Sequence, residues 1–313
     1  ATLQHFLEFV FTEPTIAAEN YCLIVQDHGL DYLGLCVDES EPKRWFMSVD
    51  GFASAVAGAT AATGGWLDLI EIDACTMAVV EMAYELRDKA GYLVASEKAV
   101  PFDGLNYREL MDGLSENPDI EPLDLAIKMV DDYEEWYTAP LGTYPTLYPY
   151  MQDFACLSVM DLSKMGPLAD AFSEFRDQVL PKDPVVKSSL NKAANHAFLA
   201  LWENCMACDY GRDIRVMFSE FADSVRATRP EAAAAADAIV DATDDVVVYH
   251  WESWRFREIC TGMSVFVPPG EGLYYVYWDS LSRVYDQLGL DFVTDTGWDE
   301  VLHAYFLSQR SSA

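Results

Sequence analysis

Hydrophobic and polar positions along the first part of the chain alternate between two patterns. Predicted strands occupy residues 21–25, 67–72 and 92–96, and the first of them is a continuous apolar run, which is typical of a strand in a parallel sheet. Apolar residues at helical spacing occupy residues 2–11, 52–63 and 77–86. Strand and helix in alternation predict an α/β fold, with a mostly parallel sheet and right-handed crossovers. In such a sheet, functional side chains gather at the carboxyl ends of the strands.

The second part of the chain has a mainly helical pattern. Predicted helices cover residues 168–179, 188–205, 217–226, 231–242 and 298–307, and predicted strands cover residues 155–160, 246–249 and 263–267. Residues 138–150 are rich in Pro, Gly and Tyr, which places a boundary near residue 145. We therefore expect a catalytic-type α/β core at 1–145 and a mainly helical region with a few added strands at 146–313.

The composition is globular and strongly acidic. Of the 313 residues, 51% are hydrophobic, which suffices for a sizeable core. The chain has 20 Lys and Arg residues against 52 Asp and Glu residues, a net charge of −32. Solubility or adaptation to salt explains most of this charge, but such a surface also repels nucleic acids and anionic membranes and attracts cationic partners. The sequence has no apolar run long enough to span a bilayer, so we expect no membrane span.

Cys75 and His28 carry the first functional signal, because each follows a predicted strand. Cys75 lies between a strand and a helix, where the positive end of the helix dipole favours a thiolate. A nearby histidine can act as its base. Gly29, directly after His28, lets a backbone N–H approach a substrate carbonyl closely. A lone cysteine at a strand end is more often a core residue, so spacing alone leaves both interpretations open.

The sequence around this pair carries three specific segments. They are Asn20–Gly29, which ends in Asp-His-Gly, Leu69–Met77, which contains Asp-Ala-Cys-Thr-Met, and Glu81–Arg87, which reads Glu-Met-Ala-Tyr-Glu-Leu-Arg. This pattern resembles the clostripain family of cysteine peptidases, relatives of caspases, gingipains and legumain. The resemblance continues through residues 92–97 and 101–104, and more weakly at 263–268 and 296–302, so it covers most of the chain. It implies a caspase-like fold.

The resemblance also implies a role for each member of the pair. Cys75 would attack the scissile carbonyl and form an acyl-enzyme, and His28 would protonate the leaving amine and activate water. The backbone N–H groups of Gly29 and Cys75 would form the oxyanion hole. The expected function is a cysteine endopeptidase acting on peptides or proteins. Two alternatives stay open: an inactive caspase-like binding or scaffold protein, and a different hydrolase or acyltransferase that uses the same pair.

Two carboxylates favour a basic residue before the cleaved bond. Asp73 lies two residues before Cys75, and residues i and i−2 of an extended segment face the same way. The resemblance places a second acidic residue in the loop after the next strand, where Asp103 stands. Together they would form an S1 pocket for Arg or Lys. The ordinary alternatives are a helix cap for Asp73 and a turn residue for Asp103.

Lys43-Arg44 is the dibasic pair between the His and Cys segments. Because family members are often matured by cleavage in this region, we expect self-cleavage after Lys43 or Arg44; the alternative is an ordinary solvated basic pair. The resemblance also implies a first strand upstream of the helix predicted at residues 2–11, and the sequence as given shows no counterpart to it. We therefore expect an early strand of the sheet without a neighbour, which would bear on stability and activity.

The resemblance requires no cofactor, and it leaves Ca²⁺ as an optional ligand by analogy with clostripain, although the sequence has no EF-hand loop. Cys205 and Cys208 have CxxC spacing without a second pair, which favours a structural role over metal binding. The family is commonly exported, so we expect a secreted or cell-envelope location, while a cytoplasmic one stays open because no signal peptide is visible.

Overall fold

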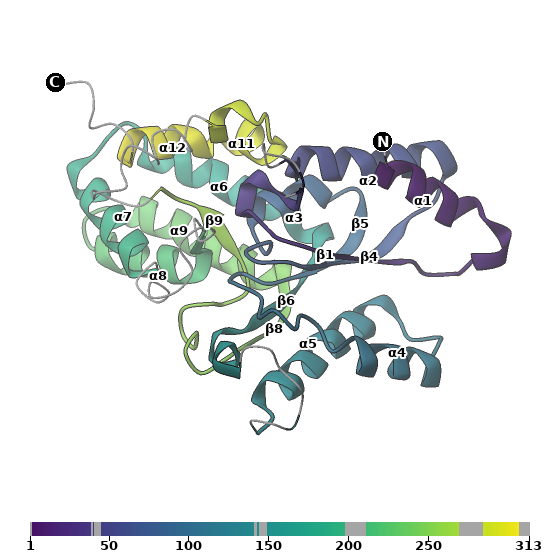
Figure 1. Cartoon of the computed structure of the whole chain (residues 1–313). Coiled ribbons are helices and arrows are strands. Elements are labelled where there is room, and N and C mark those ends of the chain that lie inside the picture. The colour runs from purple at the N-terminus through teal and green to yellow at the C-terminus, as the bar shows by residue number, and fades with distance from the viewer. Residues whose placement is uncertain are drawn as a thin grey trace.

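The computed structural model describes residues 2–38, 40, 45–140, 143, 149–197, 211–268 and 284–306. Its centre is a five-stranded sheet with the order β1-β4-β5-β6-β8 within these residues (Figure 1). The strands span Cys22–Gln26 (β1), Leu67–Asp73 (β4), Ala90–Ala95 (β5), Cys156–Asp161 (β6) and Val247–Glu252 (β8). The first three are parallel, whereas β6 and β8 join the sheet antiparallel. The expected α/β fold is confirmed, and its sheet is mixed.

Helices cover both faces of this sheet. One face packs against α1 (Thr2–Thr12), α2 (Val49–Thr63) and α3 (Val80–Leu86), and the other against α4 (Tyr107–Glu116) and α5 (Pro122–Thr138) (Figure 1). The side chains of β4 alternate between these layers: Ile70 and Ile72 enter the larger core, and Leu69 enters the smaller core beneath α5. Burial on both faces explains why apolar residues occur at both odd and even positions of this strand.

The C-terminal part of the chain is mainly helical, as expected. Its helices are α6 (Met165–Val179), α7 (Pro184–His196), α8 (Ile214–Val225), α9 (Pro230–Val246), α11 (Asp291–Thr296) and α12 (Trp298–Tyr305). An aromatic cluster connects α6, α8, α11 and α12. In it, Phe172 makes edge-to-face contacts with Phe218, Phe292 and Trp298. The indole N–H of Trp298 donates to the Phe266 carbonyl at 2.9 Å, so this buried ring also has its polar atom satisfied.

Strands from both sides of the predicted boundary near residue 145 join in the central sheet. β6 pairs with β5 and β8 pairs with β6, so the second part of the chain supplies two of the strands described above. The described residues also form two separate two-stranded antiparallel sheets. They pair β2 (Gly34–Asp38) with β3 (Trp45–Ser48), and β7 (Gly211–Asp213) with β9 (Ser264–Phe266). Short 3₁₀ helices occupy Pro14–Ile16, Asp31–Leu33, Pro149–Phe154 and Leu162–Lys164. None of the described helices has the length and apolar character needed to cross a membrane.

Candidate active site

Cys75 and His28 are brought together by the parallel pairing of β1 with β4. The last residues of the two strands, Gln26 and Asp73, are direct partners in the register. His28 and Cys75 each follow their strand by two residues, so both emerge at the same edge of the sheet. They line one cavity of about 500 Å³. The remaining lining residues are Gln26, Asp27, Asp73, Ala74, Val100, Pro101, Phe102 and Gly104.

Gly29 allows the two segments to touch. A Cβ atom at this position would lie 2.0 Å from the carbonyl oxygen of Cys75 and 2.9 Å from the side chain of Met77. A backbone oxygen cannot move aside as a flexible side chain can, so any larger residue would push the histidine loop away from Cys75. Gly29 also forms an isolated antiparallel bridge with Leu35 of β2, which fixes the loop from its other side.

The Cys75 thiol is half-buried and has a backbone partner. Its Sγ accepts the N–H of Val100 at 3.3 Å. Burial raises the pKa of the thiol, the Val100 N–H partly offsets this increase, and the nearby Asp73 carboxylate adds to it. Cys75 is therefore a protonated thiol at neutral pH in this arrangement. Within the described residues, no hydrogen bond joins it to the exposed ring of His28.

The helix after Cys75 begins later than the sequence indicates. The predicted helix starts at residue 77, whereas α3 starts at Val80. Thr76 has a positive φ of 58°, its hydroxyl donates to the Cys75 carbonyl at 2.7 Å, and its N–H donates to the Lys98 carbonyl at 2.9 Å. These contacts hold an irregular turn between strand and helix. Cys75 thus lies outside the first turn of α3, because the helix begins at Val80.

Asp73 lines the cavity and has strong hydrogen-bond donors. Its Oδ2 accepts the Tyr107 hydroxyl at 2.6 Å, the Gln26 side-chain amide at 3.1 Å and the Leu105 N–H at 3.2 Å. Asp73 as a whole residue is 5% exposed. It does not cap a helix, because α3 lacks a side-chain cap and begins seven residues later.

Asp103 stands beside the cavity, whose lining includes its neighbours Phe102 and Gly104 but not Asp103 itself. Asp103 lies near Tyr137: burial raises the pKa of the Tyr137 hydroxyl, and the charge of Asp103 adds to this increase. Of the two carboxylates expected to form the S1 pocket, Asp73 lines the cavity and Asp103 does not.

Asp27 also lines the cavity, but its carboxylate serves the backbone. Its Oδ1 accepts the N–H of His28 at 2.5 Å and the N–H of Val37 at 3.2 Å, so it stabilises the turn into β2. The structure adds three residues to the site that the sequence reasoning missed: Gln26, Val100 and Tyr107. Only Gln26 has a sequence signal, since it ends the strand that carries His28.

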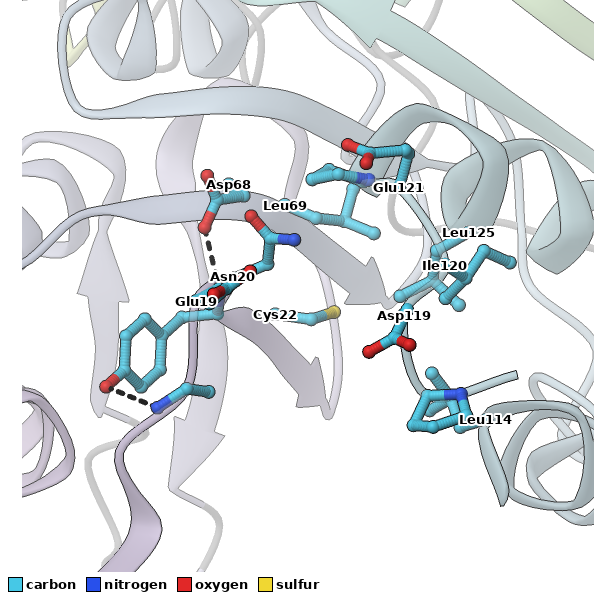
Figure 2. Close-up of a pocket in the computed structure, with 14 residues that line it drawn as sticks. Glu19, Asn20, Cys22, Asp68, Leu69, Leu114, Asp119, Ile120, Glu121 and Leu125 are labelled. Carbon is cyan, nitrogen blue, oxygen red and sulfur yellow. Dashed lines mark hydrogen bonds between the residues drawn. The ribbon is translucent and has the colours of Figure 1, made fainter. Parts of the chain in front are cut away.

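A second cavity, of about 530 Å³, lies at the opposite ends of β1 and β4 (Figure 2). Glu19, Asp68, Asp119 and Glu121 make its lining acidic, and Cys22 contributes a thiol. Burial and the nearby Glu71 carboxyl raise the pKa of Cys22 to about 12. The lining of this cavity has no histidine to serve as a base for the thiol, whereas the cavity at Cys75 contains His28. The cavity at Cys75 is therefore the candidate active site.

Some expected features fall outside the described residues. These are Lys43 and Arg44, and Cys205 and Cys208. Among the residues that the structure describes, no group of three or more His, Cys, Asp or Glu side chains could hold a metal ion.

Comparison with known proteins identifies the family. A model of the clostripain family matches residues 1–305. The chain belongs to the clostripain family. No curated protein matches the sequence.

Solved structures of the family agree with the fold. A secreted C11 cysteine protease from Bacteroides thetaiotaomicron, in complex with an irreversible peptide inhibitor, has a TM-score of 0.62 at 17% identity; the match covers 94% of this chain and 78% of that one. An inactive zymogen C11 protease from Parabacteroides distasonis has a TM-score of 0.59 at 19% identity, covering 94% and 75%. A B. fragilis cysteine protease has a TM-score of 0.57 at 18% identity, covering 86% and 98%. The resemblance and the caspase-like fold expected from the sequence are thereby confirmed.

Proposed function

We propose that this clostripain-family chain is a cysteine endopeptidase that cleaves after Lys or Arg through a Cys75–His28 dyad. The observation that carries the proposal is the shared cavity, which is lined by the Cys75 thiol, the His28 imidazole and the Asp73 carboxylate at the carboxyl ends of two parallel strands. The cavity that contains Cys22, at the opposite end of the sheet, has no histidine in its lining.

The chemistry begins with the protonated thiol. Because burial raises the pKa of Cys75, a base must take its proton as the sulfur attacks, and His28 is the imidazole in the same cavity. The new Sγ–C bond gives a tetrahedral intermediate. Its C–N bond then breaks, and the amine leaves with the proton that His28 holds. Water, deprotonated by His28, hydrolyses the acyl-enzyme and regenerates the thiol.

The backbone N–H groups of Gly29 and Cys75 are suited to hold the oxyanion. Neither donates a hydrogen bond to another residue in the described part of the chain. The Gly29–Leu35 bridge leaves the glycine amide unused, because its ladder bonds come from Leu30 and Cys36. A donor of this kind typically contributes about 3–4 kcal/mol to the transition state.

The S1 preference follows from Asp73. A carboxylate in the cavity wall, beside the nucleophile, attracts a cationic P1 side chain and repels an acidic one. Peptide or protein substrates with a basic P1 residue are therefore the proposed partners. A secreted or cell-envelope location is proposed from the secreted relative of Bacteroides thetaiotaomicron.

A cleavage assay tests the dyad. We expect the wild type to hydrolyse fluorogenic peptides with Lys or Arg at P1, and a basic acyloxymethyl ketone to label it covalently. Cys75→Ala should abolish both, and His28→Ala should abolish turnover. Cys22→Ala, which removes the thiol of the second cavity, is the matched control and should keep full activity. A wild-type protein that is folded but neither cleaves nor is labelled would favour the scaffold alternative.

We further propose self-cleavage after Lys43 or Arg44, which rests on the sequence alone. Mass spectrometry of the purified protein should show two fragments that join at this pair, and Cys75→Ala should stay intact. A Lys43→Ala/Arg44→Ala variant that still yields fragments of unchanged size would exclude this site.

A further inference from the structure

The Asp73 carboxylate is held from three sides through a single oxygen. The Tyr107 hydroxyl of α4, the Gln26 amide of β1 and the Leu105 N–H of the intervening loop all donate to Oδ2, at 2.6, 3.1 and 3.2 Å. Each donor comes from a different element, so the carboxylate cannot rotate without breaking bonds to its surroundings. Donors to an ionised carboxylate are among the strong hydrogen bonds of proteins.

Further contacts fix the loop that carries Leu105. Gly104 has a φ of +64°, and a Cβ at this position would lie 2.2 Å from Oδ2 of Asp73. The loop thus wraps the carboxylate more closely than a side chain would permit. The hydroxyl of Tyr137, on α5, donates to the Gly104 carbonyl at 2.8 Å and ties the loop to the helix beneath it.

The other oxygen of Asp73 has a different environment. No described residue donates a hydrogen bond to Oδ1, although Asp73 lines the cavity. Burial, followed by the bond to Asp73, raises the pKa of Tyr107, so its O–H stays a donor over the whole neutral range. Oδ2 is therefore permanently occupied by the protein, and Oδ1 is left for a ligand.

The difference between the two oxygens of Asp73 distinguishes a guanidinium group from an ammonium group. A guanidinium group binds a carboxylate best through two parallel N–H donors, which need both oxygens. A lysine ammonium is a compact charge that one oxygen can serve. A carboxylate with one oxygen saturated by three donors thus suits the ammonium better than the guanidinium fork.

We propose that Tyr107 is a positioning residue for Asp73, with Gln26 in support, and that it leaves the S1 pocket one acceptor oxygen, which selects Lys over Arg at P1. This inference rests on the proposed peptidase function and adds the residue that orients the specificity carboxylate. Tyr107 acts through Asp73 and does not itself touch the reacting atoms.

Steady-state kinetics of wild type and Tyr107→Phe test the proposal with three peptides that differ only at P1, which is Lys, Arg or norleucine. We expect a higher kcat/KM for Lys than for Arg in the wild type. Tyr107→Phe should raise KM for the Lys peptide about tenfold with kcat nearly unchanged. It should lower the Lys/Arg ratio and leave turnover of the norleucine peptide unaltered.

Two further variants make the experiment specific. Tyr249→Phe removes a hydroxyl that donates to Asp131 at 2.7 Å on α5, away from the cavity, and should reproduce the wild-type kinetics. Gln26→Ala removes the second donor, at an exposed position, and should raise KM for the Lys peptide by a smaller factor than Tyr107→Phe. This variant keeps the proposal testable if Tyr107→Phe fails to fold.

The outcomes separate the two proposals. A wild type that cleaves neither basic peptide refutes the peptidase function, and the inference falls with it. A wild type that cleaves both, combined with a Tyr107→Phe variant that loses kcat equally on all three peptides or shows an unchanged Lys/Arg ratio, refutes the positioning role alone.

Discussion

Glu81 makes the stability of the protein depend on pH. It lies on α3, six residues after Cys75, and its side chain is fully buried. Its Oε1 accepts the Phe266 N–H at 3.1 Å and the Tyr285 hydroxyl at 2.8 Å, and its Oε2 has no partner among the described residues. Burial outweighs these donors and raises the pKa of Glu81 from 4.5 to about 7.

The sign of the effect follows from this increase. The folded state holds the proton more tightly than the unfolded state, so Glu81 stabilises the fold fully below about pH 4.5 and loses this contribution as pH rises to about 7. At about 1.4 kcal/mol for each pH unit, the loss amounts to about 3 kcal/mol.

Glu81→Gln removes the titration while it keeps an acceptor at Oε1. We expect the free energies of unfolding of variant and wild type to be similar near pH ~5, and the variant to be more stable by about 3 kcal/mol near pH ~8. Urea unfolding followed by tryptophan fluorescence measures the difference, in a Cys75→Ala background that would prevent the proposed self-cleavage. Glu116→Gln, the same change at an exposed position of α4, is the control. A Glu81→Gln difference of equal size at both pH values would refute the reasoning.

Two other predictions concern the site and the sheet beneath it. Gly29→Ala should lower kcat/KM by about 100-fold, because its Cβ would collide with the Cys75 carbonyl oxygen, whereas Gly166→Ala, whose Cβ meets nothing within 4 Å, should be fully active. Glu71→Gln should stabilise the protein increasingly as pH rises above about 5, since burial and the Asp73 charge raise the pKa of Glu71 well above its ordinary value; a stability gain that is constant across pH in urea titrations would contradict this.

The sequence identifies the elements whose signals are local. The strand predicted at 67–72 is β4, Leu67–Asp73, whose apolar residues are buried on both faces of the sheet. The helix predicted at 298–307 is α12, Trp298–Tyr305. The juxtaposition of His28 and Cys75 was also predictable, since parallel strands place both residues at one sheet edge.

Other features depend on contacts that no local pattern contains. An apolar run does not reveal the direction of its strand, so the antiparallel entry of β6 and β8 could not be predicted. The late start of α3 depends on the bond from Thr76 N–H to the Lys98 carbonyl. Tyr107 reaches Asp73 across 34 positions of sequence, without a motif that connects them.

The second part of the chain supplies β6 and β8 to the central sheet, which has a consequence for folding during biosynthesis. His28 and Cys75 leave the ribosome early, but β8 is complete only when Glu252 has been made. Until then β6 lacks β8 as its neighbour in the sheet, and Glu81 lacks its hydrogen-bond donors Phe266 and Tyr285, which are made later still. A nascent chain stalled before residue 247 should therefore fail to react with a basic acyloxymethyl ketone, whereas the finished polypeptide should react. Such timing would keep a peptidase harmless to neighbouring polypeptides while it is still being translated.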